Sequence, residues 1–337
     1  EVPKKKSPNA SAKSGDGGKW TSISDGALEV PEDQSAQLVA RPSSEFQPAD
    51  DPAALKQVLE SELGCWAAAS WDEQFQTIEK LRCLCLFHRD HVSPIAHESL
   101  STAIEGAMNL RSALAKNGVL CLGDIMVALG RSIGEDGIDK IVTSLLSIMG
   151  KESKFLIAAA DDTMSAVVQH AHPHLLLMAC VRHLSVKGTT IASRASVTIS
   201  QCLQRLAESR EEETDGEDRV SMFQRGDDRL GALVTGLSKA ITGKGPAGRQ
   251  AAKKSLRRIQ AVLGAESFKE LVAELLGESS MTFRCVIESV NDIPKKKPAP
   301  SSGSFRQRFK LAKQKKQDTS FTFGGGVDCA SSSFVVT

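Results

Sequence analysis

The sequence predicts an all-α fold in which about six helical hairpins stack side by side into a solenoid. Aromatic residues make up only 4% of the 337 residues and tyrosine is absent, so the apolar mass is mainly leucine, alanine, valine and isoleucine. That composition favours helices packed at close range over a β-sandwich. Apolar residues recur at helical spacing, and a unit of two helices returns at intervals of roughly 35–45 residues.

The two ends of the chain lack this pattern. Residues 1–50 are rich in Ser, Lys, Asp, Gly and Pro with few clustered apolar residues, so we expect them to be disordered. Residues 293–337 form a second segment of this kind, which leaves 51–292 as the helical domain. This C-terminal tail has no acidic residue before Asp318. Its cations include Lys295, Lys296, Lys297, Arg306, Arg308 and Lys310.

The first helix of the domain is expected to begin at Pro52, behind Asp51. Aspartate caps helix N-termini, and proline suits the first helical position. Gly64 ends or interrupts this helix. Its apolar stripe consists of Leu55, Val58, Leu59 and Leu63.

The second helix begins behind a loop that delivers Trp71. Ser70 can cap this helix, and Asp72 and Glu73 fall in its first turn, where carboxylates suit the helix dipole. The apolar stripe starts only at Phe75, so Trp71 is not needed for packing, and its exposed ring suggests contact with a partner. The alternative is that Trp71 packs against the start of its own helix.

The later hairpins repeat this organisation. The acidic stretch from Glu208 to Arg219 interrupts the period, and we interpret it as an exposed insertion. The spacing is that of HEAT-type repeats, whose short turns within hairpins fall on one edge and can present a contact surface. Helices are expected at 92–108 and 114–129, 138–148 and 157–167, 175–184 and 191–206, 230–241 and 246–263, and 268–276 and 281–290.

Several classes of function find no support. The net charge of +1 gives no nucleic-acid signal for the chain as a whole. No apolar run is expected to reach the length of a membrane span, and the polar N-terminal residues do not read as a signal peptide. Most of the eight cysteines lie in apolar helical runs, which is typical of buried residues in a reducing compartment. We therefore expect no membrane partner.

No motif predicts catalysis, a cofactor or a metal. His170, His172 and His174 lie at a joint between two helices without an obvious acidic or cysteine partner, so a structural role is favoured over metal binding. The turn at 243–245 lacks the spacing of a phosphate-binding loop. We expect a binding module and not an enzyme, although a site assembled only in space stays open.

The candidate binding surface lies along the turns within the hairpins. An apolar ring at one end and cations along the rest would suit a large acidic protein partner. The alternative is that lysine is merely the usual polar filler of solenoid turns. The candidates are Trp71 in the first turn, Arg111 and Ser112 in the second, Lys151 and Lys154 in the third, Lys187 in the fourth, and Lys244 and Arg249 in the fifth.

Three of these turns resemble a known family. Residues 70–75 with 78–82 resemble the first hairpin of TOG domains. Residues 109–114 with 122–125 resemble their second hairpin in the CLASP-type subgroup, and residues 154–161 resemble the third. The nearest likeness is to the Crescerin proteins, the TOG-array regulators of axonemal microtubules. The resemblance covers residues 52–292.

The resemblance implies a flat six-repeat paddle whose turn edge binds αβ-tubulin or the microtubule lattice. It implies that Trp71 is the apolar anchor on β-tubulin, and that the cations of the later turns face α-tubulin. The basic tail would add attraction to an acidic microtubule surface. A role in microtubule dynamics or stability, in the cytoplasmic cytoskeleton or the cilium, would follow. In these terms Arg111, Ser112, Lys151 and Lys154 support the anchor, and Lys187, Lys244 and Arg249 form the cationic end.

Two departures from the family pattern stand in the sequence. Asn117 and Gly118 place a helix-weakening pair inside the second hairpin, and the fourth turn lacks the asparagine often found there. Two other functions stay open. A HEAT-repeat scaffold could bind a partner other than tubulin through its convex face or its tails. Nucleic acid is an unlikely partner, and would be bound through the basic tail and the helix that carries Arg257 and Arg258.

Overall fold

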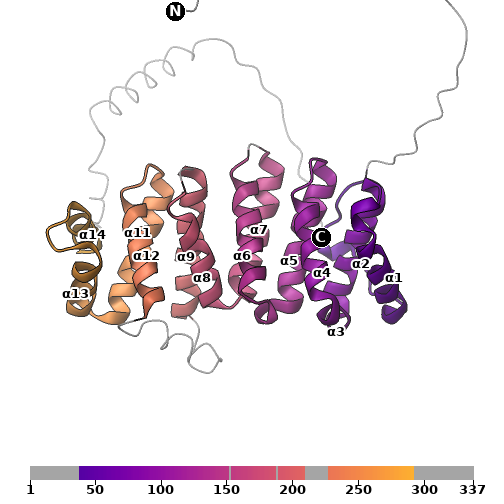
Figure 1. Cartoon of the computed structure of the whole chain (residues 1–337), viewed down its shortest axis with the longest axis horizontal. Coiled ribbons are helices and arrows are strands. Elements are labelled where there is room, and N and C mark those ends of the chain that lie inside the picture. Colours follow the sequence, from indigo (N-terminus) through magenta and orange to yellow (C-terminus); the bar gives the residue numbers. More distant parts are fainter. Residues whose placement is uncertain (1–37, 152, 187–188, 209–226, 292–337) are drawn as a thin grey trace, which may run out of the picture. The chain divides into compact units, whose positions relative to one another are not determined.

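The computed structural model describes residues 38–151, 153–186, 189–208 and 227–291, and every regular element in these ranges is helical. The helices pair into six hairpins, as the apolar spacing predicts (Figure 1). They are α1 (Pro52–Gly64), α2 (Trp71–Phe87), α3 (Arg89–Val92), α4 (Ala96–Ala107), α5 (Ser112–Leu129), α6 (Glu135–Met149), α7 (Lys154–His170), α8 (Pro173–His183), α9 (Thr189–Glu208), α11 (Asp228–Ile241), α12 (Pro246–Leu263), α13 (Ala265–Leu276) and α14 (Met281–Asn291).

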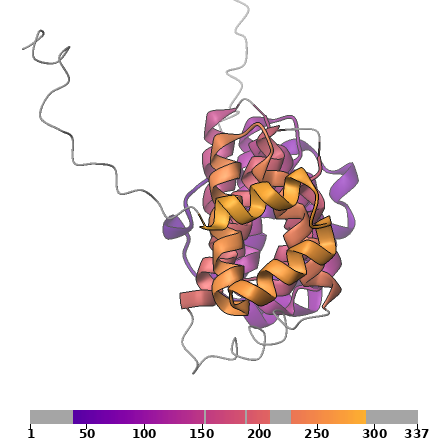
Figure 2. The same ribbon diagram turned by 90° about the vertical axis from the view of Figure 1, so that its left-hand side faces the viewer.

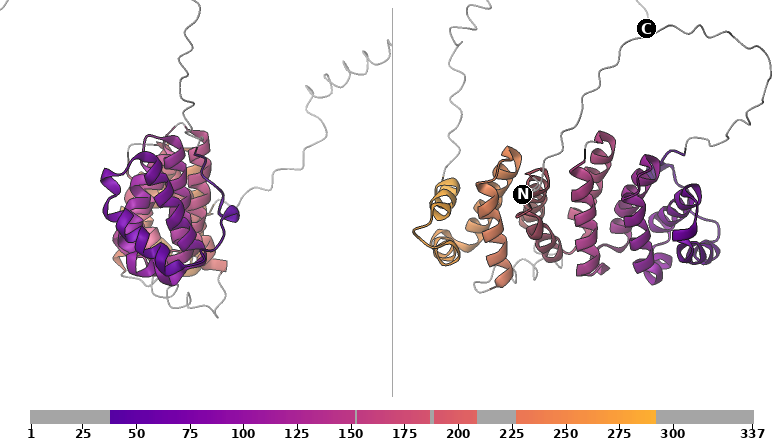
Figure 3. Two further views of the ribbon diagram at one scale, coloured as in Figure 1. Left: turned by 90° about the vertical axis from the view of Figure 1, so that its right-hand side faces the viewer. Right: turned by 45° about the horizontal axis from the view of Figure 1, so that its top comes forward.

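The hairpins stack in two layers. One layer is formed by the second helices of the hairpins, which pack in the order α2, α5, α7, α9, α12 and α14. The other layer is formed by the first helices, in the order α1, α4, α6, α8, α11 and α13. End-on views show the helices on two sides of the stack (Figures 2 and 3). Leucine, isoleucine and valine side chains fill the space between the layers, so each hairpin depends on its neighbours for burial.

The turns inside successive hairpins lie next to each other along one edge, which we call the turn edge. It comprises the connections α1–α2, α4–α5, α6–α7, α8–α9, α11–α12 and α13–α14. The guanidinium of Arg111 lies over the Trp71 ring, which joins the first two turns. A Cβ at Gly248 would lie 2.7 Å from the Cα of Ser193, which places the fifth turn against the start of α9. Several of these turns line the upper edge in Figure 1.

Helix α5 is the central helix of the first half. By length and composition the run Ser112–Ser132 could cross a membrane, so the expectation that no run reaches that length is wrong. However, 67% of its apolar window is buried, and α5 packs against α2, α4 and α7. It also carries Asp124, which is paired with Arg82. We therefore assign α5 as the core helix of a solenoid.

Asn117 and Gly118 are packing residues of α5 and not a weak point in it. The Asn117 side chain is fully buried, and its amide donates to the carbonyl oxygen of Phe75 at 3.2 Å. A Cβ at Gly118 would lie 2.3 Å from the backbone nitrogen of Ala107 and 2.6 Å from the carbonyl carbon of Gly106. Glycine therefore lets the two helices of the second hairpin, α4 and α5, touch backbone to backbone. Asn117 joins this hairpin to α2.

Residues 40–51, which we call the strap, pack on the layer formed by α2 and α5. Arg41 donates two hydrogen bonds of 2.9 Å to the carboxylate of Glu79 on α2. The Phe46 ring is buried, with the guanidinium carbons of Arg41 and Arg82 at 4.5 and 4.7 Å from its centroid. The expected disorder of the first 50 residues is therefore wrong for the strap.

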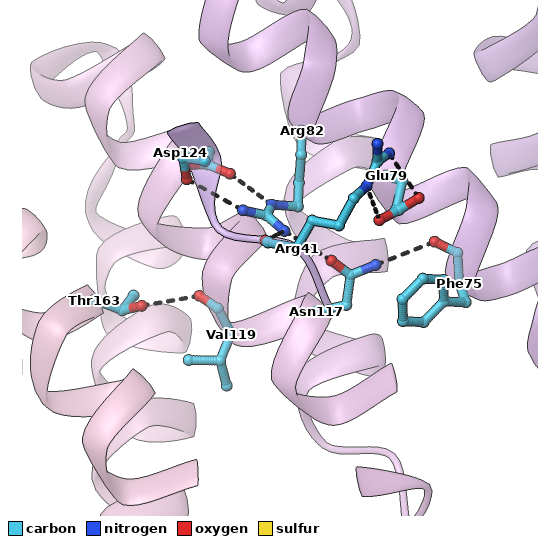
Figure 4. Close-up of polar contacts among 9 residues, drawn as sticks. Arg41, Phe75, Glu79, Arg82, Asn117, Val119, Asp124 and Thr163 are labelled. Atoms are coloured by element: carbon cyan, nitrogen blue, oxygen red, sulfur yellow. Dashed lines mark hydrogen bonds and ion pairs between the residues drawn. The ribbon is translucent and has the colours of Figure 1, made fainter. Parts of the chain in front are cut away.

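A buried polar network centres on Arg82, whose side chain is 0% exposed (Figure 4). Its Nε donates to Asp124 at 2.7 Å, and its Nη1 donates to the side chain of Asn117 at 3.0 Å and to the backbone oxygen of Arg41 at 2.7 Å. The Ser43 hydroxyl donates to the other oxygen of Asp124 at 2.8 Å. One arginine thus ties α2, α5 and the strap together.

Three predictions fall on residues outside the described ranges. They are the disorder of residues 1–37, the exposed acidic insertion up to Arg219 and the disordered basic tail from residue 293.

Candidate functional site

The first turn presents Trp71 at the surface. Trp71 is the first residue of α2, and its side chain is partly exposed, whereas Phe75 one turn later is buried. A capping box fixes this helix start, because the backbone N–H and the hydroxyl of Ser70 both donate to Glu73, at 2.7 and 2.6 Å. The ring therefore projects from a rigid helix end, outside the stripe that builds the core.

Arg111 in the second turn lies directly over this ring. Its guanidinium carbon is 4.8 Å from the Trp71 ring centroid, which is the geometry of a cation–π contact. The backbone N–H of Arg111 donates to the Asn109 side chain at 2.9 Å, and this bond shapes the turn. The stack orients the indole. The contact partner of the ring is Arg111 in the next hairpin, so Trp71 does not pack on its own helix alone.

Besides Trp71, the turn edge exposes further apolar residues, among them Met108, Leu110, Phe155, Val186 and Met281. Leu110, beside Arg111, is fully exposed, and Phe155, beside Lys154, is 48% exposed. Both lie in or next to a short turn, outside the apolar stripe of the helix that follows. Trp71 has the same position relative to its helix, so this sequence signal also identifies Leu110 and Phe155 as candidates.

The third and fifth turns carry cations. Lys151 and Lys154 are exposed on either side of the start of α7, and Lys244 is exposed between α11 and α12. Arg249 is exposed too, but its Nη1 donates to the backbone oxygens of Gly243 and Lys244, at 2.9 and 3.2 Å. Arg249 therefore holds the fifth turn in shape. Ser112 is exposed at the first position of α5, and Lys187 and the tail cations lie outside the described residues.

Charge changes sign along the turn edge. Exposed carboxylates of Asp72 and Glu73 flank Trp71, and hydrogen bonds from Ser70 lower the pKa of both groups, so they stay ionised at neutral pH. From the third to the fifth turn the exposed charged residues at the described positions are Lys151, Lys154, Lys244 and Arg249, and the sixth turn carries the exposed acid Glu278. The edge thus has an aromatic end with mixed charge, a positively charged stretch over the third to fifth turns, and an acidic residue in the sixth turn.

The arginines of α12 are used inside the fold. Arg257 donates to the backbone oxygens of Ser289 and Val290 at the end of α14, at 2.8 and 3.2 Å. Arg258 donates to the backbone oxygen of Ser200 on α9 at 2.8 Å. Because these guanidinium groups already join neighbouring hairpins, the nucleic-acid interpretation of this helix loses its main support.

Comparison with known proteins points to one family. No protein-family model matches the chain. The chain is 26% identical over 137 residues to TOG array regulator of axonemal microtubules protein 1 of mouse (Mus musculus), and 27% identical over 130 residues to the protein of the same name in Homo sapiens. Each match covers 39% of this chain, but only 8% and 7% of the relatives' own lengths.

One solved structure comes from a study of microtubule plus-end tracking by XMAP215, CLIP-170 and EB1. It aligns with 72% of this chain and 92% of its own, at 15% identity and a TM-score of 0.48. Over 39% of its length this chain is similar to the TOG-array regulators of axonemal microtubules, which confirms the resemblance to TOG domains that the turn motifs predict.

Proposed function

We propose that this chain is a non-catalytic module that binds αβ-tubulin, free or within the microtubule lattice, through its turn edge. The observation that carries the proposal is the partly exposed Trp71 ring, held under Arg111 on a rigid helix end. A large amphipathic ring that is oriented before binding loses little side-chain entropy when it is buried by a partner.

The distribution of charge supports an acidic partner. The lysines of the third and fifth turns are exposed in short turns, and such cations speed encounter with a negatively charged surface. The names of the relatives, which are regulators of axonemal microtubules, support a role in the cytoskeleton or cilium and an effect on microtubule dynamics or stability. The basic tail would add attraction to the same acidic surface.

Replacing Trp71 with glutamate should weaken binding by about 2 kcal/mol or more, which is about thirtyfold in Kd. The reason is that the variant removes the central apolar anchor and adds a charge beside Asp72 and Glu73. Co-sedimentation with microtubules and gel filtration with free αβ-tubulin would measure the change.

The matched control for that substitution is Phe87→Glu. Phe87 is 43% exposed at the opposite end of the same helix, about 25 Å from Trp71 along the axis. This variant should bind like the unaltered chain. Equal affinity of the Trp71 variant and the unaltered chain would refute the proposed interface.

Reversing the charges of Lys151 and Lys154 together should slow association with tubulin and make the affinity less sensitive to salt. Exposed charges at the edge of an interface act mainly through long-range attraction, which ions screen. Stopped-flow binding at two ionic strengths would test this. Lys269→Glu, an exposed site on α13, provides the control, and an identical salt dependence in all three proteins would argue against a cationic contact.

A further inference from the structure

A groove with an apolar floor opens between α4 and α6, on the layer opposite the strap. Its volume is about 660 Å³. Residues of the connection between α5 and α6 line one end of the groove. This connection lies at the edge opposite the turn edge, so the groove is separate from Trp71 and the turn lysines. The apolar lining residues are Leu100 and Ile104 from α4, Ile125 and Leu129 from α5, and Ile133 from the connection.

The floor offers apolar surface to a ligand. Leu100 and Ile104 lie one helical turn apart on α4, and both remain partly exposed because α6 does not cover this side of α4 along the groove. A concave apolar surface of this kind is a preferred place for a ligand that carries large apolar side chains. The residues are spaced to receive two rings from one face of a helix or from an extended segment.

The rim of the groove is mainly acidic. It carries Glu105, Glu135 and Asp136, with Lys140 as the lysine among the lining residues. Asp136 pairs with Lys140 at 2.8 Å, while in the described part of the chain Glu105 has no ion-pair partner. Glu135 pairs with Arg182 of α8 at 2.6 Å.

Both of these rim pairs are exposed. The side chains of Asp136 and Lys140 are 78% and 55% exposed, and pairs of this kind contribute little and exchange easily. The carboxylates can therefore accept a new cation without a large loss. The ligand that fits has apolar side chains separated by positive charges.

We propose that this groove binds the chain's own segment 305–311, Phe-Arg-Gln-Arg-Phe-Lys-Leu. Phe305 and Phe309 are four residues apart, so a helical conformation of the bound segment would place the two rings one turn apart, as Leu100 and Ile104 are on α4. Arginine and lysine residues stand between and after them, and no acidic residue occurs from 293 to 317. The two rings meet the apolar floor, and the cations meet the rim carboxylates.

The segment can reach the groove of the same chain. Residues 292–304 connect it to the end of α14, and thirteen residues span up to about 45 Å when extended. The groove lies between the second and third hairpins, and packed helices are about 10 Å apart, so the sixth hairpin is about 35 Å away. Binding within one chain is therefore allowed by length.

Zero-length carbodiimide cross-linking of the full chain, followed by mass spectrometry of the monomer fraction, tests the proposal. We expect links from Glu105 or Asp136 to Lys310 or Lys313. Replacing Phe305 and Phe309 with alanine should reduce these links about tenfold, because the apolar contribution to binding is lost. Replacing Phe321 and Phe323, which lie in the same tail outside the basic run, should leave them unchanged.

Each other outcome would overturn the assignment. Links that appear between chains in a mixture of ¹⁴N and ¹⁵N protein would show that a second copy supplies the segment. Links spread equally over acidic residues far from the groove, such as Glu288, would show unspecific attraction, and no links at all would leave the groove to another partner. The test uses no tubulin, and Trp71→Glu should not alter its result, so it can fail independently of the proposed function.

Discussion

Replacing Arg82 with methionine is expected to lower the free energy of unfolding by about 3–5 kcal/mol. The substitution keeps most of the side-chain volume but leaves the carboxylate of Asp124 buried without its counter-charge. It also removes donors to Asn117 and to the backbone oxygen of Arg41. Urea unfolding followed by circular dichroism would measure the loss.

Lowering the pH should reduce the difference in free energy of unfolding between the Arg82→Met variant and the unaltered chain. Burial raises the pKa of Asp124, and Arg82 opposes that rise, so the pKa rises further when Arg82 is absent. The unfolded-state pKa of an aspartate is about 3.9. When the folded-state pKa is higher than this, the protonated carboxyl stabilises the folded protein fully below the unfolded-state pKa, and this stabilisation is lost as the pH rises through the folded-state pKa. The variant should therefore approach the unaltered chain in stability as the pH falls from 7 toward 4.

Two further variants test whether the loss of stability in Arg82→Met comes from the uncompensated charge of Asp124. Adding Asp124→Leu should restore much of the stability, because it removes the uncompensated charge. Lys80→Met, on the same helix as Arg82, breaks the partly exposed pair of Lys80 with Glu62 of α1, and it should cost less than about 1 kcal/mol. If Arg82→Met costs no more than Lys80→Met, the network does not stabilise the fold as argued.

Gly118→Ala is expected to destabilise the protein by about 3 kcal/mol, although the same change inside a helix usually stabilises by up to about 1 kcal/mol. The reason is steric, since the new Cβ would meet the backbone of α4 at 2.3 Å and neither backbone can move without separating the helices. Thermal unfolding followed by calorimetry would give the sign and the size.

Gly123→Ala supplies the matched control in the same helix. There the nearest atom to an added Cβ is the Thr163 hydroxyl oxygen at 3.4 Å, which is an ordinary contact. This variant should be as stable as the unaltered chain or more stable. Equal effects at the two positions would mean that the backbone contact between α4 and α5 does not control stability.

The sequence was sufficient for the helices and their pairing, because apolar spacing and short polar turns are local signals. It was not sufficient for the strap. Phe46 is a lone aromatic residue in a polar stretch, and its partners Arg41 and Arg82 are identified only when α2 is in place. Helix propensity alone marks Asn117 and Gly118 as a weak point in α5, because propensity is a local property. Their packing depends on α2 and α4, which propensity does not take into account.

The candidate site shows the same division. Trp71 stood out because it precedes an apolar stripe, and the structure places it at the surface. Its stack with Arg111 joins two hairpins and could not be derived from either one alone. Arg249, Arg257 and Arg258 read as free cations in sequence, yet their hydrogen bonds to backbone oxygens appear only in three dimensions. That Trp71 and the turn lysines contact tubulin stays a prediction.

The strap also changes what is expected of the first hairpin. An end repeat has a neighbour on one side only, so in solenoids it is prone to fray before the interior melts. Here the hydrogen bonds from Arg41 to Glu79 and from Arg82 to the strap hold the strap against α2, and so stabilise the first hairpin. The first hairpin, which carries Trp71, is thereby held in its folded arrangement, so the exposed surface around the indole keeps one shape in the absence of any ligand.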